Sequence, residues 1–155
     1  MTDQSHPFPP EDAHLYIHEM FEYWNGRRAG RAYPDRSDID PSEVAELLSY
    51  ITLVDVGDGD PRFVYRVVGS FVTRLLGQDP INLPVGTGVI PDRLEQVLAR
   101  YTLVADTGEG YFHRTELHEE RNDFTTVDRL MLPLGPPDEP VGSILCVVVP
   151  VGATN

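Results

Sequence analysis

Residues 51–69 read ITLVDVGDGDPRFVYRVVG and carry the strongest structural signal in the sequence. Two runs rich in β-branched and aromatic residues, Ile51–Val56 and Arg62–Gly69, flank a segment of glycine, aspartate and proline. Such runs favour β-strands, and a polar segment of this composition between them is typical of a tight turn. The stretch therefore predicts a β-hairpin.

Two helices are predicted before this hairpin. The first should begin near residues 10–12, because apolar residues follow at positions i, i+3, i+4 and i+7. These residues are Ile17, Met20, Phe21 and Trp24. The second, shorter helix should begin at Asp40, since aspartate can cap a helix, Pro41 suits its first turn and Glu43 can reach back to the cap.

Two more helices and three strands are predicted after the hairpin. Ser70 is expected to cap a short helix that ends at Gly77, and a longer helix should follow Pro91, after a loop at 79–90. The apolar stripe of the longer helix consists of Leu94, Val97, Leu98 and Tyr101. The strands are Tyr111–Leu117, Phe124–Leu132 and Gly142–Val149, with a turn at 133–140. The last strand is almost continuously apolar, which predicts a central strand that is covered on both faces.

This element order predicts an α+β fold, a five-stranded antiparallel sheet with helices inserted after its second strand. The chain has 155 residues, of which 41% are hydrophobic, enough for one domain with a substantial core. We assign residues 11–150 to a single domain, residues 1–10 to a flexible leader and residues 151–155 to a tail.

The composition narrows the classes of partner. A formal net charge of −13 would repel nucleic acid and anionic membranes, although the acidic surface can also serve solubility alone. No apolar run approaches the ~20 residues of a membrane helix, and no apolar leader segment is visible. The single cysteine, Cys146, excludes a disulfide within the chain. We therefore expect a cytoplasmic protein that binds neither nucleic acid nor membranes.

Several segments together resemble the PAS superfamily, and in particular a PAS-like family of alphaproteobacteria that was long described as a domain of unknown function. The matching segments are YW at 23–24, RRAGR at 27–31, PDRSDIDP at 34–41, LVDV at 53–56, FVYRVVG at 63–69 and DRLMLPL at 128–134. The resemblance implies a PAS-like sheet with the inserted helices on one face and an additional N-terminal helix. The chain departs from the family at residues 80–84, PINLP, beside the expected pocket.

The resemblance implies a stand-alone sensory or regulatory module in signal transduction. Such a module binds a small molecule between the sheet and the inserted helices, or binds a regulatory protein. A second hypothesis is an interaction adaptor whose pocket is filled by Tyr65, Leu75 and Met131. The third is a small α+β enzyme, but neither a G-x-S-x-G turn nor a phosphate-binding loop followed by Lys-Ser/Thr occurs, so we predict no catalytic residues and no enzymatic activity.

The candidate ligand-binding residues are Tyr65, Arg66, Arg74, His113, Arg129 and Met131. Arginine can hold a carboxylate ligand, or it can bridge strands to an aspartate such as Asp55 or Asp128. By strand alternation Arg66 points away from Phe63, Tyr65 and Val67, and Arg129 shares a face with Val127 and Met131. His113 lies mid-strand where the wall of a PAS pocket is expected, unless it is simply a sheet histidine.

Phe21 and Trp24 are the candidate interface residues, since the N-terminal helix either covers the sheet or pairs two chains into a homodimer. No haem is expected, because the helix after Pro91 lacks the histidine of haem-binding relatives. No covalently reacting flavin is expected either, because the Asn-Cys-Arg motif is absent and Cys146 belongs to the core.

We predict no metal site. His14, His18 and Glu22 share one helix face but supply too few enclosed ligands. His113 and His118 frame the acidic residues Glu116, Glu119 and Glu120, but their odd separation would place them on opposite faces of a strand, so they are not expected to share a metal.

Overall fold

The computed structural model describes residues 7–89, 91–118 and 124–151. Five strands form one antiparallel sheet in the order β2-β1-β5-β4-β3. Their bounds are β1 Ile51–Val56, β2 Phe63–Val68, β3 Tyr111–His118, β4 Phe124–Leu134 and β5 Ser143–Val151. The helices are α1 Leu15–Arg27, α2 Ser70–Leu76 and α3 Pro91–Thr107, with 3₁₀ segments η1 Arg36–Asp38 and η2 Pro41–Tyr50. The predicted α+β fold is confirmed.

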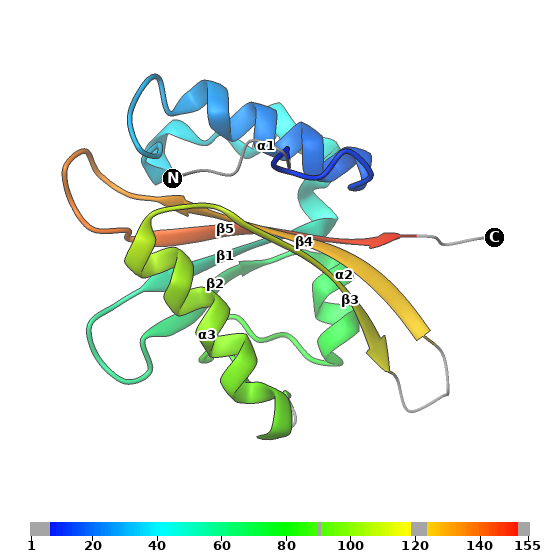
Figure 1. The fold of residues 1–155 in the computed structure, drawn as a ribbon. Coiled ribbons are helices and arrows are strands. Elements are labelled where there is room, and N and C mark those ends of the chain that lie inside the picture. Colours follow the sequence, from blue (N-terminus) through cyan, green and yellow to red (C-terminus); the bar gives the residue numbers. More distant parts are fainter. Residues whose placement is uncertain (1–6, 90, 119–123, 152–155) are drawn as a thin grey trace.

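Helices lie on both faces of the sheet (Figure 1), and each face forms an apolar layer with them. On one face α1 packs Ile17, Met20 and Trp24 against alternate residues of β4 and β5. On the other face α2 and α3 cover the sheet, and Tyr101, Val104 and Ala105 of α3 pack against its opposite set of side chains. The inserted helices therefore share one face, as the resemblance implied.

β5 lies at the centre of the sheet, and the first seven of its nine residues are buried, which confirms the prediction from its continuous apolar run. The turn after β4 begins later than predicted, because β4 continues through Pro133 to Leu134. β4 pairs with β3 only as far as Met131, so Pro133 lies where the strand has one neighbour. Such a position tolerates a residue that lacks an N–H.

The helix starts differ from the predictions in their hydrogen bonds. α1 begins at Leu15 and not near 10–12, with His14 as its cap: the His14 Nδ1 accepts the Tyr16 N–H at 2.9 Å. Asp40 caps η2 as predicted, but Glu43 does not reach back, because its carboxylate accepts the Tyr23 hydroxyl at 2.7 Å. That hydroxyl also accepts the Asp40 N–H at 2.8 Å and so takes the place predicted for Glu43.

α2 begins one residue away from the predicted cap and ends as predicted. Gly69, and not Ser70, is its cap residue, without a side-chain hydrogen bond. Gly77 adopts a φ of 75°, a left-handed conformation that glycine accommodates without strain and that ends the helix.

A β-bulge in the first hairpin changes the direction of its side chains. Leu53 pairs with Val67, whereas Val54 pairs with Tyr65, so Arg66 is the additional residue on β2. Tyr65 consequently points toward α2 and α3, and Val67 points with Leu53 toward the α1 side. The prediction that Val67 shares a face with Tyr65 is wrong, because simple alternation does not allow for an inserted residue.

Candidate functional site

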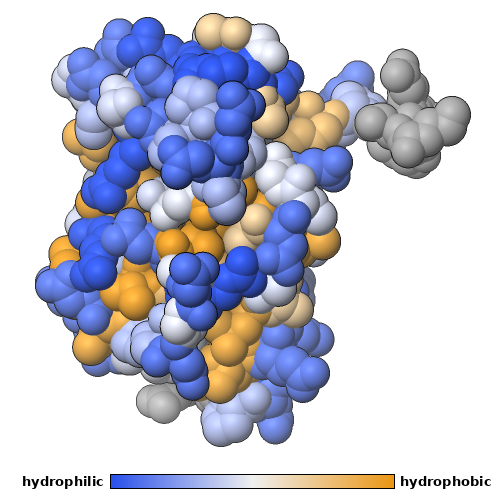
Figure 2. Space-filling model, turned by 90° about the vertical axis from the view of Figure 1, so that its left-hand side faces the viewer, coloured by the Kyte–Doolittle hydropathy of each residue, from blue (hydrophilic) through white to orange (hydrophobic). Residues whose placement is uncertain are grey.

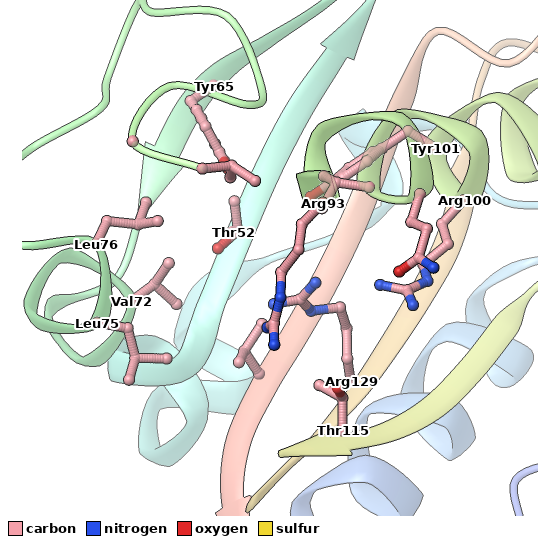
Figure 3. A pocket seen from close by; sticks show the side chains of 15 residues that line it. Thr52, Tyr65, Val72, Leu75, Leu76, Arg93, Arg100, Tyr101, Thr115 and Arg129 are labelled. Atoms are coloured by element: carbon pink, nitrogen blue, oxygen red, sulfur yellow. The ribbon is translucent and has the colours of Figure 1, made fainter. Parts of the chain in front are cut away.

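A cavity of about 440 Å³ lies between the sheet and the two inserted helices (Figure 3). One side is apolar and consists of Val72, Leu75 and Leu76 from α2. The other side is cationic, because Arg93 and Arg100 extend from α3 and Arg129 extends from β4 toward the same space. The cavity is therefore amphipathic, with its apolar and charged sides on different elements.

The helical period of α3 brings Arg93 and Arg100 to the cavity. Together with Gln96 and Val97 they occupy positions i, i+3, i+4 and i+7, which lie on one face of a helix. The apolar stripe predicted for this helix, from Leu94 to Tyr101, lies on the adjacent side and packs against the core through Tyr101. Arg93, Gln96 and Arg100 repeat at the same helical spacing beside that stripe. This repeat of polar residues is the sequence signal that could have identified the two arginines.

The floor of the cavity consists of side chains from adjacent strands. In the β4–β5 pair Arg129 lies opposite Val148, and in the β3–β4 pair it lies opposite His113. Directly opposed residues of antiparallel strands point to the same face, so all three face α2 and α3. Thr52 from β1 and Thr115 from β3 add hydroxyl groups to the same lining.

The electrostatics of the cavity are one-sided. Its lining contains three arginines and no aspartate or glutamate, and in the described part of the chain none of the three forms an ion pair. Among the residues that the structure describes, the buried Arg129 Nε and Thr52 Oγ1 have no hydrogen-bond partner, and neither do the two ring nitrogens of His113. Buried polar groups are almost always hydrogen-bonded, so these atoms mark a place where a further molecule can bind.

Burial and positive charge change the chemistry of nearby side chains. Burial, together with the charges of Arg129 and Arg100, lowers the pKa of His113 to about 3, which leaves the imidazole neutral near pH 7. Burial raises the pKa of the Cys146 thiol to about 11, and its sulfur lies 3.8 Å from the Tyr101 hydroxyl. Cys146 is a core residue and a poor nucleophile.

The structure brings three of the six candidate ligand residues together. Tyr65 and Arg129 line the cavity, and His113 lies beside Arg129. Tyr65 and Leu75 line the space that the adaptor hypothesis expected them to fill. Met131 is fully buried in the core with Tyr101 and does not line the cavity.

The other two candidates lie outside the cavity. The Arg66 Nε donates to Asp55 at 2.7 Å, which is the cross-strand pair offered as the alternative, and its Nη1 donates to Asn82 at 2.7 Å. Arg74 is exposed and stacks on Phe71, with 5.9 Å between its guanidinium carbon and the ring centre. The suggested Arg129–Asp128 pair does not form, because neighbouring strand residues point to opposite faces and Asp128 binds Arg114 at 2.6 Å on the α1 side.

The candidate interface residues belong to the α1 layer. Trp24 is only 5% exposed, and its Nε1–H donates to the Pro133 carbonyl at 2.9 Å, so it covers the sheet of its own chain. Phe21 is partly buried, and its ring meets the ring of Phe8 edge-on with 5.6 Å between the ring centres. This contact packs the end of the predicted leader against α1.

The histidines that the structure describes do not come together with other ligating groups. His14 caps α1, and no group of three His, Cys, Asp or Glu side chains converges among the residues that the structure describes. Glu119, Glu120 and the His118 side chain lie outside the described part. Within it, no helix is both long and apolar enough to cross a membrane.

Comparison with known proteins identifies the family and the fold. The family model described as "PAS domain" matches residues 13–149. A PAS domain from Colwellia psychrerythraea is similar, with a TM-score of 0.53, 10% identity, and coverage of 71% of this chain and 95% of that one. A LOV protein from Rhodobacter sphaeroides has a TM-score of 0.53 and 12% identity, and the match covers 76% of this chain and 71% of the LOV protein. A light-oxygen-voltage domain studied with a flavin analogue has a TM-score of 0.55, 10% identity, and coverage of 72% and 84%.

At these identities the solved structures show a shared fold. No curated protein matches the chain.

Proposed function

Because this chain belongs to the PAS domain family, a family of sensory modules, we propose that it is a regulatory module that binds a small molecule and acts without catalysing a reaction. The observation that carries the proposal is the cavity between α2, α3 and the sheet, where buried polar atoms of Thr52 and Arg129 find no hydrogen-bond partner within residues 7–89, 91–118 and 124–151. A small molecule in the cavity would supply those partners and contact the apolar side at the same time.

The ligand is proposed to bind without a covalent bond. The one cysteine of the chain lies on β5 in the core, and burial raises the pKa of its thiol to about 11. A thiolate is the reactive form of cysteine, so Cys146 is poorly suited to attack a bound chromophore.

Ligand binding can change the outer surface of the protein by changing the position of α3. The buried residues of this helix, Tyr101, Val104 and Ala105, all lie in its second half, whereas Arg93 and Gln96 near its start are exposed. A ligand held between Arg93 and Arg129 would therefore fix the first half of α3 against the sheet. We propose that a regulatory protein partner binds the liganded and unliganded forms with different affinity, since a binding module needs a second molecule to pass its signal on.

The adaptor hypothesis predicts that the cavity is irrelevant to function. We propose to distinguish it from the sensor by filling the cavity with Val97→Trp, which puts an indole into the space between α3 and the sheet. The matched control is Leu103→Trp, the same substitution at a 47% exposed position of the same helix.

The measurement is thermal stabilisation by a library of small metabolites. We expect some compounds to raise the unfolding temperature of the wild type and of Leu103→Trp, but not of Val97→Trp, because only ligands that bind the folded state stabilise it. Equal stabilisation of a folded Val97→Trp protein would place binding elsewhere, and no stabilisation by any compound would favour the adaptor.

A further inference from the structure

The charges of the cavity point to the chemical class of its ligand. We infer that the ligand is a small organic anion with at least two negative charges, a phosphate ester or a dicarboxylate, joined to an apolar part. This inference rests on the proposed function and specifies the molecule that the cavity accepts.

The three arginines of the cavity differ from others in the same chain. Arg31, Arg62 and Arg114 pair with aspartates at 2.6 to 2.9 Å. The chain has 25 acidic and 12 basic residues, so carboxylates are abundant, yet the cavity lining contains none. Three guanidinium groups facing one another in a partly enclosed space repel, and an anion between them removes that repulsion.

The arrangement of these arginines fits an anionic group with several oxygens. Arg93 and Arg100 lie seven residues apart on α3, a rise of about 10 Å along the helix axis. Arg129 approaches from the sheet, and its buried Nε has no hydrogen-bond partner in the described part of the chain. Guanidinium groups bind carboxylate and phosphate oxygens through paired N–H bonds, so donors from two directions can engage more than one oxyanion edge. One negative charge would leave most of the positive charge unbalanced, so a dianion fits better.

His113 adds hydrogen bonding but no fourth positive charge. Its two ring nitrogens are buried and have no partner among the described residues, and it lies opposite Arg129 in the β3–β4 pair. Since its pKa is about 3, the neutral ring offers one donor and one acceptor at physiological pH. His113 does not itself line the cavity, so its role is to border Arg129 without adding a further positive charge.

The apolar side of the cavity requires more than an inorganic ion. Val72, Leu75 and Leu76 of α2 face the cationic side, and Tyr65 also contributes to the lining (Figure 3). An ion such as free phosphate would leave this surface in contact with water, whereas an organic body would cover it.

The test compares three probes of similar size by isothermal titration calorimetry. Phenyl phosphate and isophthalate are dianions with an apolar ring, and benzamide is a neutral compound with the same ring. We expect both or one of the dianions to bind, more weakly as salt is added, and benzamide to bind at least tenfold more weakly. The tighter dianion indicates whether the natural head group is a phosphate or a pair of carboxylates.

Two variants and a matched control locate the binding. Arg129→Gln and Arg100→Gln should each weaken dianion binding tenfold or more, about 1.4 kcal/mol. Arg74→Gln makes the same charge change on exposed α2 surface and should bind like the wild type. Unliganded Arg129→Gln should unfold at no lower a temperature than the wild type, because the substitution removes like-charge repulsion. This readout separates loss of binding from loss of folding.

The outcomes separate this inference from the proposed function. If neither dianion binds, or if Arg129→Gln and Arg100→Gln bind the dianions as the wild type does, the anion class is wrong. If benzamide binds as tightly as the dianions and Val97→Trp abolishes this binding, the proposed sensory cavity is supported but its ligand is not selected by charge. If Val97→Trp abolishes binding of the dianions as well and benzamide remains weak, both proposals are supported.

Discussion

His113 and Arg129 lie side by side on neighbouring strands, and the charge of Arg129 makes protonation of His113 less favourable. Burial removes water from the imidazole, and the guanidinium groups of Arg129 and Arg100 oppose its protonation. The Nε of Arg129 has no hydrogen-bond partner among the residues with described positions. The pair therefore occupies a position where an apolar residue would be more stable, which is common where a protein binds a ligand.

The lowered pKa of His113 predicts a contribution to acid sensitivity. In the unfolded chain a histidine takes up a proton below pH 6.5, whereas folded His113 remains neutral until about pH 3. Between these values the unfolded state binds more protons, so stability falls as the pH falls. In His113→Phe this contribution is lost, and urea unfolding should show that the variant gains stability relative to the wild type as the pH decreases from 6.5. Above pH 6.5 the two curves should be parallel, and parallel curves throughout would contradict the prediction.

One buried carboxylate helps to attach the segment before α1 to the sheet. Asp128 on β4 is completely buried and accepts hydrogen bonds from the Arg114 Nε at 2.6 Å and from the His14 N–H at 2.8 Å. Arg114 also donates to the Asp12 carbonyl at 3.0 Å. These contacts join the segment before α1 to the β3–β4 pair and reinforce the apolar packing of Ile17, Met20 and Trp24.

Removing the charge of Asp128 should destabilise the protein strongly. We expect Asp128→Asn to lower the free energy of unfolding by about 3 kcal/mol, since the buried partner of Arg114 is lost. The control is Asp106→Asn on α3, whose carboxylate is exposed and pairs with Arg62 at 2.9 Å. That change should cost less than about 1 kcal/mol. Urea denaturation measures both, and losses of equal size would show that the buried network has no special role.

The molecule as a whole combines a large negative charge with exposed apolar side chains. The face seen in Figure 2 is mostly hydrophilic at the height of α1, whereas apolar groups gather across its middle and lower part. On α1 itself Leu15 is 63% exposed, and on α3 Leu103 is 47% exposed. Like charges oppose association of two copies, while apolar surface favours it.

We propose that two copies pair through the outer surface of α1, where Leu15 is exposed and Phe21 is only partly buried, whereas Trp24 packs against the sheet of its own chain. Added salt screens the repulsion between two copies that each carry a charge of −13, so the dimer fraction should rise with salt. Anion binding in the cavity should instead weaken, because salt screens the attraction to the arginines. Light scattering across a salt series measures the first effect. Leu15→Glu should shift the protein toward monomer, and Leu103→Glu on α3 should not. A monomer at all salt concentrations would rule out the dimer, and a dimer that Leu15→Glu leaves intact would place the interface elsewhere.

Local sequence patterns predicted most of the elements and part of the site. Strand alternation correctly placed Arg129 with Val127 and Met131 on one face, and the apolar run of β5 identified the central strand. Helical spacing identified the buried residues of α1. These features follow from the repeat of the backbone, which depends on neighbouring residues, so they can be read before the chain folds.

The cavity and its charge depended on contacts between distant segments. Arg93 and Arg100 meet Arg129 because α3 packs across β4 and β5, and no spacing within α3 indicates that a third arginine will join them. The bulge at Arg66 and the exclusion of Met131 from the cavity also arise from pairing and packing. Burial and the sum of nearby charges decide the protonation of His113, and both exist only after the sheet and helices have assembled.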